Sequence, residues 1–284
     1  MDRHTIIFTA DKRLRDLGNL LPGKRILCSW DEYGKKAGER GDVERVYVFP
    51  TPVNKLEQYR NIPKLKEELA SQKVRCVFGG IFDEGWRLFF AEKGISYVDF
   101  TQNADVVEEN AKITAEAVIA ELLLLSPYSI CGQEISVTGF GACGRAIAEK
   151  LKALGAKVLI VARSDTARNE AKKAGYRSCN FMEWRQEVGK MLTVINTVPA
   201  PVVTEDIISG MSKEAVILDI ASRPGGTDFA CATEKGIPAK LALGLPGIYS
   251  TKSSALSYKK AMLQHAPLQD IKRGEQSWIF QIII

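Results

Sequence analysis

Alternating strand-like and helix-like segments predict an α/β protein of two domains, each built on a parallel sheet with helices on both faces. Short apolar runs recur between amphipathic stretches through most of the 284 residues. A glycine-rich turn at residues 139–144 separates one such strand from the helix after it. One helical stretch, residues 103–125, would span about 33 Å, which is long enough to link two domains.

The first domain is predicted to be a flavodoxin-like α/β domain over residues 1–126, with the linking helix included. Its strand patterns lie at residues 5–9, 25–29, 45–49, 75–78 and 96–100. Helical patterns at 64–71 and 84–93 lie between some of these strands. Pro127 stops the linking helix, and Ser126-Pro127-Tyr128 marks the boundary.

The second domain is predicted to be a doubly wound parallel sheet over residues 127–250. Its strand patterns lie at residues 134–138, 157–161, 192–196, 215–220 and 239–243, and its helical patterns at 142–154, 166–174, 205–210 and 229–235. In the remaining segment, 251–284, a helix over 251–264 is expected to return the chain to the first domain. The apolar tail after Pro267 is interpreted as an edge strand, a subunit contact or an aggregation-prone extension.

The composition is that of a soluble globular protein, with 45% hydrophobic and 26% charged residues. The net charge of +5 is mild, and the lysine pairs are isolated, so we expect no nucleic-acid partner. A small anionic ligand accounts for the positive charge equally well. No apolar run approaches the roughly 20 residues of a membrane span, so no membrane partner is expected.

Cysteine usage and the first residues predict a cytoplasmic protein. The six cysteines form no CxxC pair and have no adjacent histidine, which argues against a zinc site and against a disulfide framework. The N-terminal residues lack the pattern of a signal peptide. We therefore expect no metal and reduced thiols.

The turn Gly139-Phe140-Gly141-Ala142-Cys143-Gly144 follows a strand and opens an amphipathic helix, which is the context that a dinucleotide-binding GxGxxG motif requires. The first glycine permits the tight turn, the second lets the backbone approach a pyrophosphate, and the third lets helix and strand pack closely. The helix N-terminus offers N–H groups to the phosphates. The second domain is therefore expected to be a Rossmann domain.

The next strand ends in Ala162-Arg163-Ser164, where an NAD enzyme carries an acid for the ribose 2′-hydroxyl. Arg163 can instead hold a 2′-phosphate, Ser164 can add a hydrogen bond, and Arg168 is close enough in sequence to help. Asp165 is a complication, because an acid slightly later could serve NAD. The pattern favours NADP(H).

Two later strand ends supply further candidates. Asn196-Thr197-Val198-Pro199 either lines the nicotinamide crevice or is an ordinary turn, and spacing alone does not decide. The loop from Asp219 to Asp228 contains Arg223, which can clamp a carboxylate, and Gly225-Gly226, which can let a backbone approach a ligand; a purely structural turn is the alternative. The cofactor-binding candidates are Gly139, Phe140, Gly141, Ala142, Cys143, Gly144, Ala162, Arg163, Ser164, Thr197, Val198, Pro199 and Ala221.

Histidine usage restricts the chemistry, because only His4 and His265 exist and neither lies in these loops. Proton transfer would fall to Lys252, Asp228, a tyrosine or water. Lys252 lies just beyond a second glycine-proline loop, residues 244–247, that is expected at the same sheet edge. The catalytic candidates are therefore Arg223, Asp228 and Lys252.

The chain resembles the dipicolinate synthase A-subunit family, most specifically in a serine-arginine-proline-glycine-glycine run. The residues that carry the resemblance are Leu218-Asp219-Ile220-Ala221-Ser222-Arg223-Pro224-Gly225-Gly226-Thr227-Asp228-Phe229, Gly244-Leu245-Pro246-Gly247-Ile248, the glycine loop, Ala162-Arg163-Ser164, Ile195-Asn196-Thr197-Val198-Pro199 and, more weakly, Asn110, Thr114 and Glu116. One difference lies near the N-terminus, where the family usually shows a glycine-rich turn and this chain has Thr9-Ala10-Asp11-Lys12.

The resemblance implies an NADP(H)-dependent oxidoreductase that makes dipicolinate, the pyridine-2,6-dicarboxylate of bacterial spores formed in sporulation. The precursor would be a dihydro- or hydroxytetrahydrodipicolinate of the lysine pathway, and the partner a flavoprotein second subunit. Two carboxylates on the substrate would suit Arg223 and Lys252, with Asp228 or Lys252 as base. A homo-oligomer is also expected.

Two alternatives stay open. One is another NADP-dependent dehydrogenase of a small carboxylic acid. The other is a non-catalytic nucleotide-binding regulatory subunit, which the scarcity of proton-transfer residues would suit.

Overall fold

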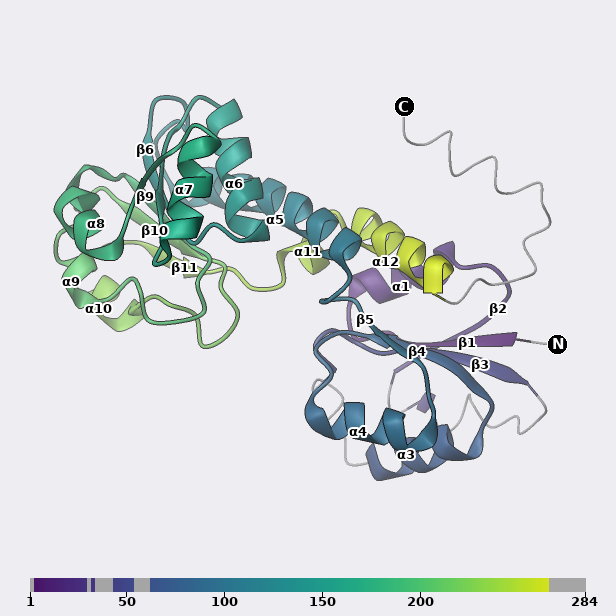
Figure 1. The fold of residues 1–284 in the computed structure, drawn as a ribbon. Helices are drawn as coiled ribbons and strands as arrows, with labels where there is room; N and C mark the ends of the chain where they lie inside the picture. The colour runs from purple at the N-terminus through teal and green to yellow at the C-terminus, as the bar shows by residue number, and fades with distance from the viewer. Residues whose placement is uncertain (1–2, 30–31, 34–42, 54–61, 266–284) are drawn as a thin grey trace. The chain divides into compact units, whose positions relative to one another are not determined.

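The computed structural model describes residues 3–29, 32–33, 43–53 and 62–265 (Figure 1). The chain divides into two compact units: residues 1–109 with 250–284 form the first unit, and residues 110–249 form the second. The long helix α5 (Ala104–Leu125) contributes to both, since its residues from Asn110 onward count with the second unit. Each unit is built on one parallel sheet, which confirms the predicted α/β class.

The first unit has five strands in the order β2-β1-β3-β4-β5, which is the order of a flavodoxin-like domain. The strands are β1 (Arg3–Phe8), β2 (Lys24–Cys28), β3 (Glu44–Val48), β4 (Val74–Gly79) and β5 (Tyr97–Asp99). The inner strands β1, β3 and β4 bury nearly all of their residues, as expected for a parallel sheet covered on both faces.

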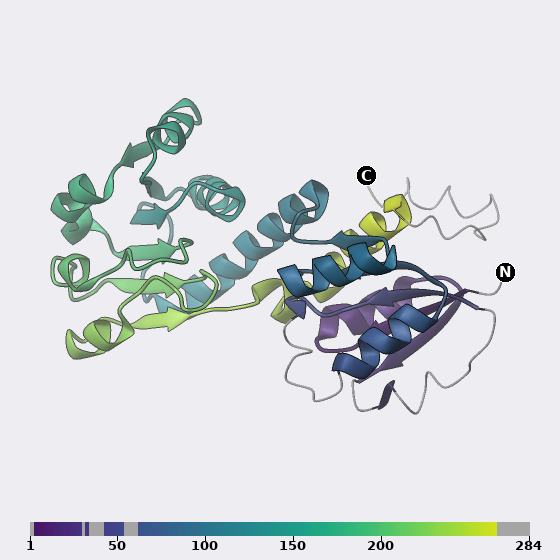
Figure 2. The ribbon, with the colours of Figure 1, turned by 60° about the horizontal axis from the view of Figure 1, so that its bottom comes forward.

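Helices α3 (Ile62–Ser71) and α4 (Glu84–Lys93) cover one face of this sheet, and α1 (Lys12–Leu20) and α12 (Thr251–His265) cover the other (Figure 2). The expected helix after residue 250 is therefore present, and it packs on α1. Arg13 donates a hydrogen bond to the Tyr258 hydroxyl at 3.1 Å, and Thr251 donates one to Asp16 at 2.6 Å. The Tyr258 ring stacks on Phe100 with ring centroids 4.2 Å apart.

Helix α1 was not predicted, because its sequence is polar and contains Gly18. Its burial explains both features. Leu14 and Leu17 face the sheet, and a Cβ on Gly18 would lie 2.7 Å from the side chain of Leu27 on β2. A glycine that looks like a helix breaker thus allows close packing of helix and sheet.

The second unit has six strands in the order β11-β10-β9-β6-β7-β8, which is the Rossmann order. The strands are β6 (Glu134–Thr138), β7 (Lys157–Val161), β8 (Arg177–Cys179), β9 (Thr193–Asn196), β10 (Val216–Asp219) and β11 (Ala239–Leu241). Strand β8 was missed because it is three residues long and half polar; pairing with β7 defines it.

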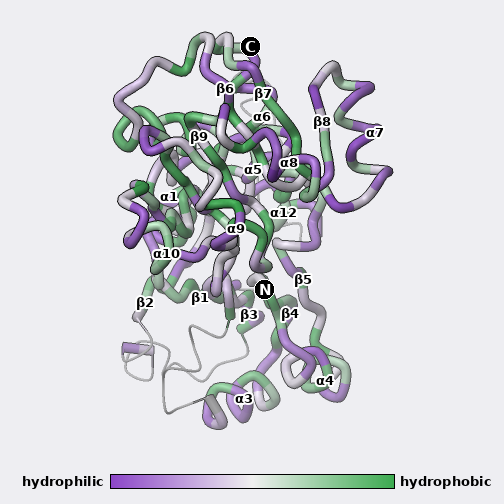
Figure 3. Tube along the Cα trace, turned by 90° about the vertical axis from the view of Figure 1, so that its left-hand side faces the viewer, coloured by the Kyte–Doolittle hydropathy of each residue, from purple (hydrophilic) through white to green (hydrophobic). Residues whose placement is uncertain are grey.

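Apolar residues of α5, α6 (Ala142–Ala153) and α7 (Asp165–Lys173) bury one face of this sheet. The opposite face packs against α8 (Phe181–Glu187), η2 (Val188–Lys190), α9 (Glu205–Ile208) and α10 (Phe229–Glu234). A short helix, α11 (Leu245–Ile248), follows β11. Neither α8 nor α11 was predicted. In Figure 3, α7 is drawn largely in the hydrophilic colour, which agrees with a helix that faces solvent along most of its surface.

Among the described residues, no helix is both long and apolar enough to cross a membrane. The tail after Pro267, interpreted as an edge strand or a contact segment, lies outside the described residues.

Candidate functional site: a phosphate loop at the carboxyl edge of the second sheet

In the loop between β6 and α6, backbone conformation and packing within the chain require glycine at two positions. Gly139 has a φ of +86°, and a Cβ there would lie 2.6 Å from the Thr197 hydroxyl oxygen. A Cβ on Gly144 would lie 2.3 Å from the carbonyl oxygen of Gly139. Both positions therefore exclude a side chain, the first by conformation and packing and the second by packing alone.

Gly141 is different, because nothing lies within 4 Å of the position that its Cβ would occupy. It is exposed, it is the N-cap of α6, and it has ordinary extended backbone angles, φ −76° and ψ −167°. As glycine it provides no side chain to cap the N–H groups of the first helical turn. The loop thus leaves an uncapped helix N-terminus next to open space, which is the geometry that an anionic pyrophosphate needs.

Arg145, in the first turn of α6, holds the loop in place. Its Nε donates to the carbonyl oxygen of Phe140 at 2.9 Å, and its guanidinium lies 5.3 Å from the centre of the Phe140 ring. An ion pair with Glu170 on α7, at 2.9 Å, holds the other end of the guanidinium. Phe140 is buried against Tyr176. Because the peptide group is planar, the bond to the Phe140 carbonyl also orients the N–H of Gly141.

Cys143 lies half-buried in the same turn. Burial raises the pKa of its thiol, against a smaller opposing hydrogen bond with Thr114 of α5. A neutral thiol adds no negative charge beside a phosphate site.

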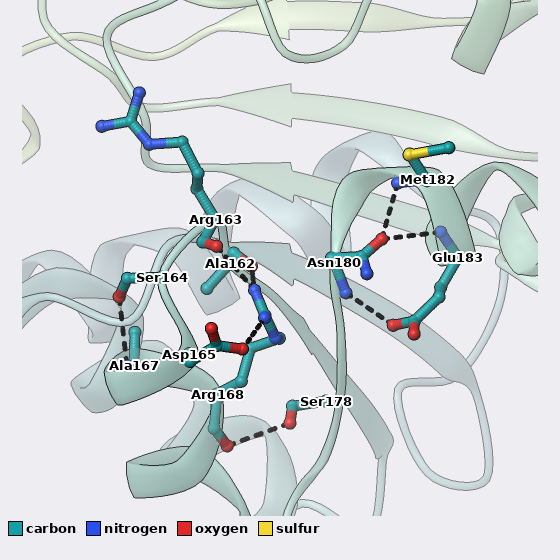
Figure 4. Close-up of polar contacts among 10 residues, drawn as sticks. All are labelled: Ala162, Arg163, Ser164, Asp165, Ala167, Arg168, Ser178, Asn180, Met182 and Glu183. Carbon is teal, nitrogen blue, oxygen red and sulfur yellow. Dashed lines mark hydrogen bonds and ion pairs between the residues drawn. The ribbon is translucent and has the colours of Figure 1, made fainter.

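Figure 4 shows how the polar side chains that follow β7 are used. The Ser164 hydroxyl caps α7 by accepting a hydrogen bond from the Ala167 N–H at 3.1 Å. Arg168 donates to the carbonyl oxygens of Ala162 and Arg163 and forms an ion pair with Asp165. The Arg163 side chain is exposed and extends away from this cluster, and within the described chain its guanidinium has no hydrogen bond or ion pair.

The loop after β9 is built on Asn196, which is fully buried. Its side-chain oxygen accepts hydrogen bonds from the Thr138 hydroxyl at 2.5 Å and from the Val198 N–H at 3.0 Å. The Thr197 hydroxyl donates to the Thr138 carbonyl at 2.7 Å. Thr197 and Val198 therefore lie beside Gly139 at the edge of the sheet, and Pro199 is exposed.

Asp219 organises the loop after β10 in a similar way. Its buried carboxylate accepts hydrogen bonds from the N–H groups of Ala221 and Gly226, both at 2.9 Å, and from the Thr227 hydroxyl at 2.7 Å. Asp219 is not among the candidates that the sequence pattern indicates. An acid directly after a buried apolar strand is the sequence signal that could have identified it.

The two glycines of that loop pack against protein. A Cβ on Gly226 would lie 2.4 Å from the carbonyl oxygen of Ala200, and one on Gly225 would lie 3.4 Å from the Asp219 carboxylate. Gly226 is thus required by packing and Gly225 by its φ of +86°, and the expectation that they also let a ligand approach the backbone stays a prediction. Gly226 joins the loops after β9 and β10 into one surface.

The candidate catalytic residues do not all lie in one unit. Arg223 is exposed on the loop after β10, and Asp228 is the N-cap of α10, where it accepts a hydrogen bond from the Cys231 N–H at 2.9 Å. Lys252 is exposed on α12 of the first unit. His4 is buried in β1, and His265 ends α12 with its ring 3.4 Å from the Asn103 amide. Among the described residues, no group of three or more metal-binding side chains comes together.

Residues 102–222 match the family described as D-isomer specific 2-hydroxyacid dehydrogenase, NAD binding domain. Over 190 residues the chain is 33% identical to the dipicolinate synthase A-subunit from Bacillus subtilis (strain 168); the match covers 66% of this chain and 64% of that relative. The chain thus matches slightly less than two thirds of the length of this curated relative.

Solved structures agree on the fold. The dipicolinate synthase A-subunit from Bacillus halodurans has a TM-score of 0.74 at 23% identity, covering 93% of this chain and 97% of that chain. The transhydrogenase from Sinorhizobium meliloti has a TM-score of 0.62 at 15% identity, with 92% of each chain covered.

The match over 190 residues confirms the resemblance that the sequence predicts. The dehydrogenase match implies a nicotinamide cofactor.

Proposed function

We propose that this chain, a relative of the dipicolinate synthase A-subunit, is an NADP(H)-dependent oxidoreductase subunit that forms dipicolinate. The observation that carries the proposal is the 33% identity over 190 residues to that relative. The proposed substrate is a dihydro- or hydroxytetrahydrodipicolinate. Losing water from the hydroxylated form, and then a hydride and a proton, leaves the aromatic pyridine dicarboxylate.

The residues present fit a dinucleotide. The open side of Gly141 and the uncapped first turn of α6 would hold the pyrophosphate. Arg163 would hold the 2′-phosphate, and Ser164 can still donate its hydroxyl hydrogen while its oxygen caps α7. The nicotinamide, when bound, supplies the two-electron acceptor.

The substrate roles follow from charge. Arg223 is an exposed guanidinium on a loop that Asp219 holds rigid, so it would clamp one ring carboxylate. Lys252, the further catalytic candidate from the sequence, lies on α12 of the first unit. Asp228 is the other candidate base, because only one of its oxygens is used for capping.

The expected partners are further copies of this chain and a flavoprotein second subunit, in the cytoplasm. The name of the relative supports a second subunit, since that relative is itself one component of a synthase.

The decisive test incubates the chain with NADP⁺ and freshly generated hydroxytetrahydrodipicolinate and follows dipicolinate by terbium luminescence, with and without the candidate flavoprotein. We expect dipicolinate only when this chain is present. Arg223→Ala should remove activity and leave NADPH binding intact, whereas Lys173→Ala, which removes an exposed charge at the end of α7, should change neither.

A protein that binds NADPH but forms no dipicolinate would contradict the substrate. The 2-hydroxyacid dehydrogenase match would then favour another small carboxylic acid. Absence of turnover with every such acid would favour a nucleotide-binding regulatory subunit.

A further inference from the structure

We infer that Arg168 is a positioning residue that sets the preference for NADP(H), by holding Asp165 away from the ribose and by fixing the backbone from which Arg163 extends. The inference rests on the proposed use of NADP(H).

Arg168 is turned into the protein. Its Nη1 donates to the carbonyl oxygen of Ala162 at 2.7 Å and to that of Arg163 at 2.6 Å, so both hydrogens of this nitrogen are used (Figure 4). Its Nη2 forms the ion pair with Asp165. The Arg168 side chain is only 16% exposed. A guanidinium held in this way is not free to reach out to a phosphate.

The bonds to the two carbonyls hold the backbone from which the Arg163 side chain extends. They lie at the carboxyl end of β7, where the chain turns from strand into α7. In Figure 4, Arg163 leaves this turn on the side away from Arg168, with its guanidinium uncontacted by the residues drawn. Arg168 therefore holds the backbone, and Arg163 presents its charge outward.

The ion pair determines what Asp165 can do. Asp165 is the first acid after β7. In an NAD enzyme, an acid near this place accepts a hydrogen bond from the ribose 2′-hydroxyl, and its negative charge repels a 2′-phosphate. Its side chain is 89% exposed, so the ion pair by itself is weak. It is reinforced because Arg168 is also held by two backbone carbonyls and cannot turn away. Asp165 thus keeps the Arg168 guanidinium as its ion-pair partner in the first turn of α7.

The test measures dissociation constants for NADPH, NADH and adenosine 2′-monophosphate in four proteins: the full wild-type chain, Arg168→Met, Asp165→Asn, and the double variant. In Arg168→Met we expect NADPH and adenosine 2′-monophosphate to bind about tenfold more weakly, and NADH as well as or better than in the wild type. Adding Asp165→Asn should recover part of the lost NADPH affinity, because the uncompensated carboxylate is gone, and the part not recovered measures the lost backbone anchor.

Three results would overturn the inference. Equal weakening of NADPH and NADH in Arg168→Met would show a merely structural role. Loss of NADPH affinity that Asp165→Asn does not relieve at all would show that Arg168 does not act through Asp165. A wild-type chain that binds NADH as tightly as NADPH would contradict the proposed cofactor, and the inference with it.

If Arg168→Met does not fold, the NADH affinity of Asp165→Asn alone still tests the inference. The inference requires unchanged NADH affinity in this variant, because the carboxylate does not serve the ribose. Weaker NADH binding would contradict it.

Discussion

In each unit, a central strand of the sheet runs directly into a helix, and the two turns treat the helix N-terminus in opposite ways. In the first unit, Asp11 caps α1: its carboxylate accepts a hydrogen bond from the Leu14 N–H at 3.2 Å and pairs with Arg13 at 2.7 Å. In the second unit, Gly141 has the corresponding cap position and offers no side chain to α6.

The difference shows that a parallel α/β topology does not by itself make a phosphate site. A helix N-terminus attracts an anion in either unit. In the first unit the chain supplies that anion from its own aspartate, and in the second no side chain takes that place. We therefore expect the cap residue to distinguish a structural turn from a binding turn.

Gly144→Ala should have the largest effect on folding. The new Cβ would lie 2.3 Å from a backbone oxygen, and overpacking of this kind costs about 3 kcal/mol of unfolding free energy. Urea unfolding measures it. The matched variant is Gly141→Ala in the same loop, where the Cβ meets open space; it should stay within about 1 kcal/mol of the wild type. Equal destabilisation by the two variants would contradict the packing argument.

Gly141→Asp should give α6 in the second unit the same kind of aspartate cap that α1 has in the first. The backbone angles of Gly141 suit any residue, and an aspartate there would cap α6 as Asp11 caps α1, stabilising the cofactor-free chain by about 1 kcal/mol. The same carboxylate would repel the pyrophosphate, so NADPH affinity should fall on the order of 100-fold. Calorimetric titration and thermal unfolding of one preparation measure both. Retained affinity would mean that the cofactor does not use this helix end.

Asp11→Ala is the reciprocal change in the first unit. Loss of the cap should cost about 1 kcal/mol of stability and leave NADPH affinity unchanged. Asp11→Asn keeps a capping oxygen and loses the ion pair with Arg13, so it should be milder than alanine. If the asparagine variant is as unstable as the alanine variant, the stabilisation by Asp11 comes from its ion pair with Arg13 and not from capping.

The smallest expected effect depends on pH. Burial pushes the pKa of Glu121 on α5 upward, but hydrogen bonds from Lys240 and Tyr249 outweigh it and leave the pKa below its ordinary value. A lowered folded pKa stabilises the protein above the unfolded pKa, near 4.3, and the contribution is lost as pH falls through the folded value.

Glu121→Gln should therefore reduce the unfolding free energy by up to about 1 kcal/mol at neutral pH. Below about pH 4.3 the unfolding free energy of the variant should fall less steeply with pH than that of the wild type. The matched variant in the first unit is Glu44→Gln. The pKa of Glu44 is also lowered, by Arg3 and Arg75 against a burial effect, but its side chain is 22% exposed compared with 7% for Glu121. We expect the larger change in the loss of stability at acid pH in Glu121→Gln, because Glu121 is the more buried of the two. A larger change in Glu44→Gln would contradict this.

Prediction from sequence succeeded where a local pattern was strong. The bounds of β6 and β7 agree with the predicted strands, because both lie between turn residues: β7 is apolar after its first residue, and β6 alternates polar residues with Ile135 and Val137. It failed for α1, β8, α8 and α11, which are short or polar. Trp184 makes α8 a core element, and only the sheet that it covers reveals this.

The sequence by itself determined the glycine-rich turn, since three glycines between a buried strand and an amphipathic helix specify both the turn and the open cap. It also placed Arg163 at the end of β7, because strand length and direction follow from periodicity. Only the tertiary structure decided what the polar side chains do. Asn196 is tied to Thr138, 58 residues earlier, and the Asp219 carboxylate is withdrawn from solvent by its own loop. Hydrogen bonds depend on distances and burial that exist only once the strands are side by side, so spacing along the chain cannot distinguish a side chain that builds a loop from one that awaits a ligand.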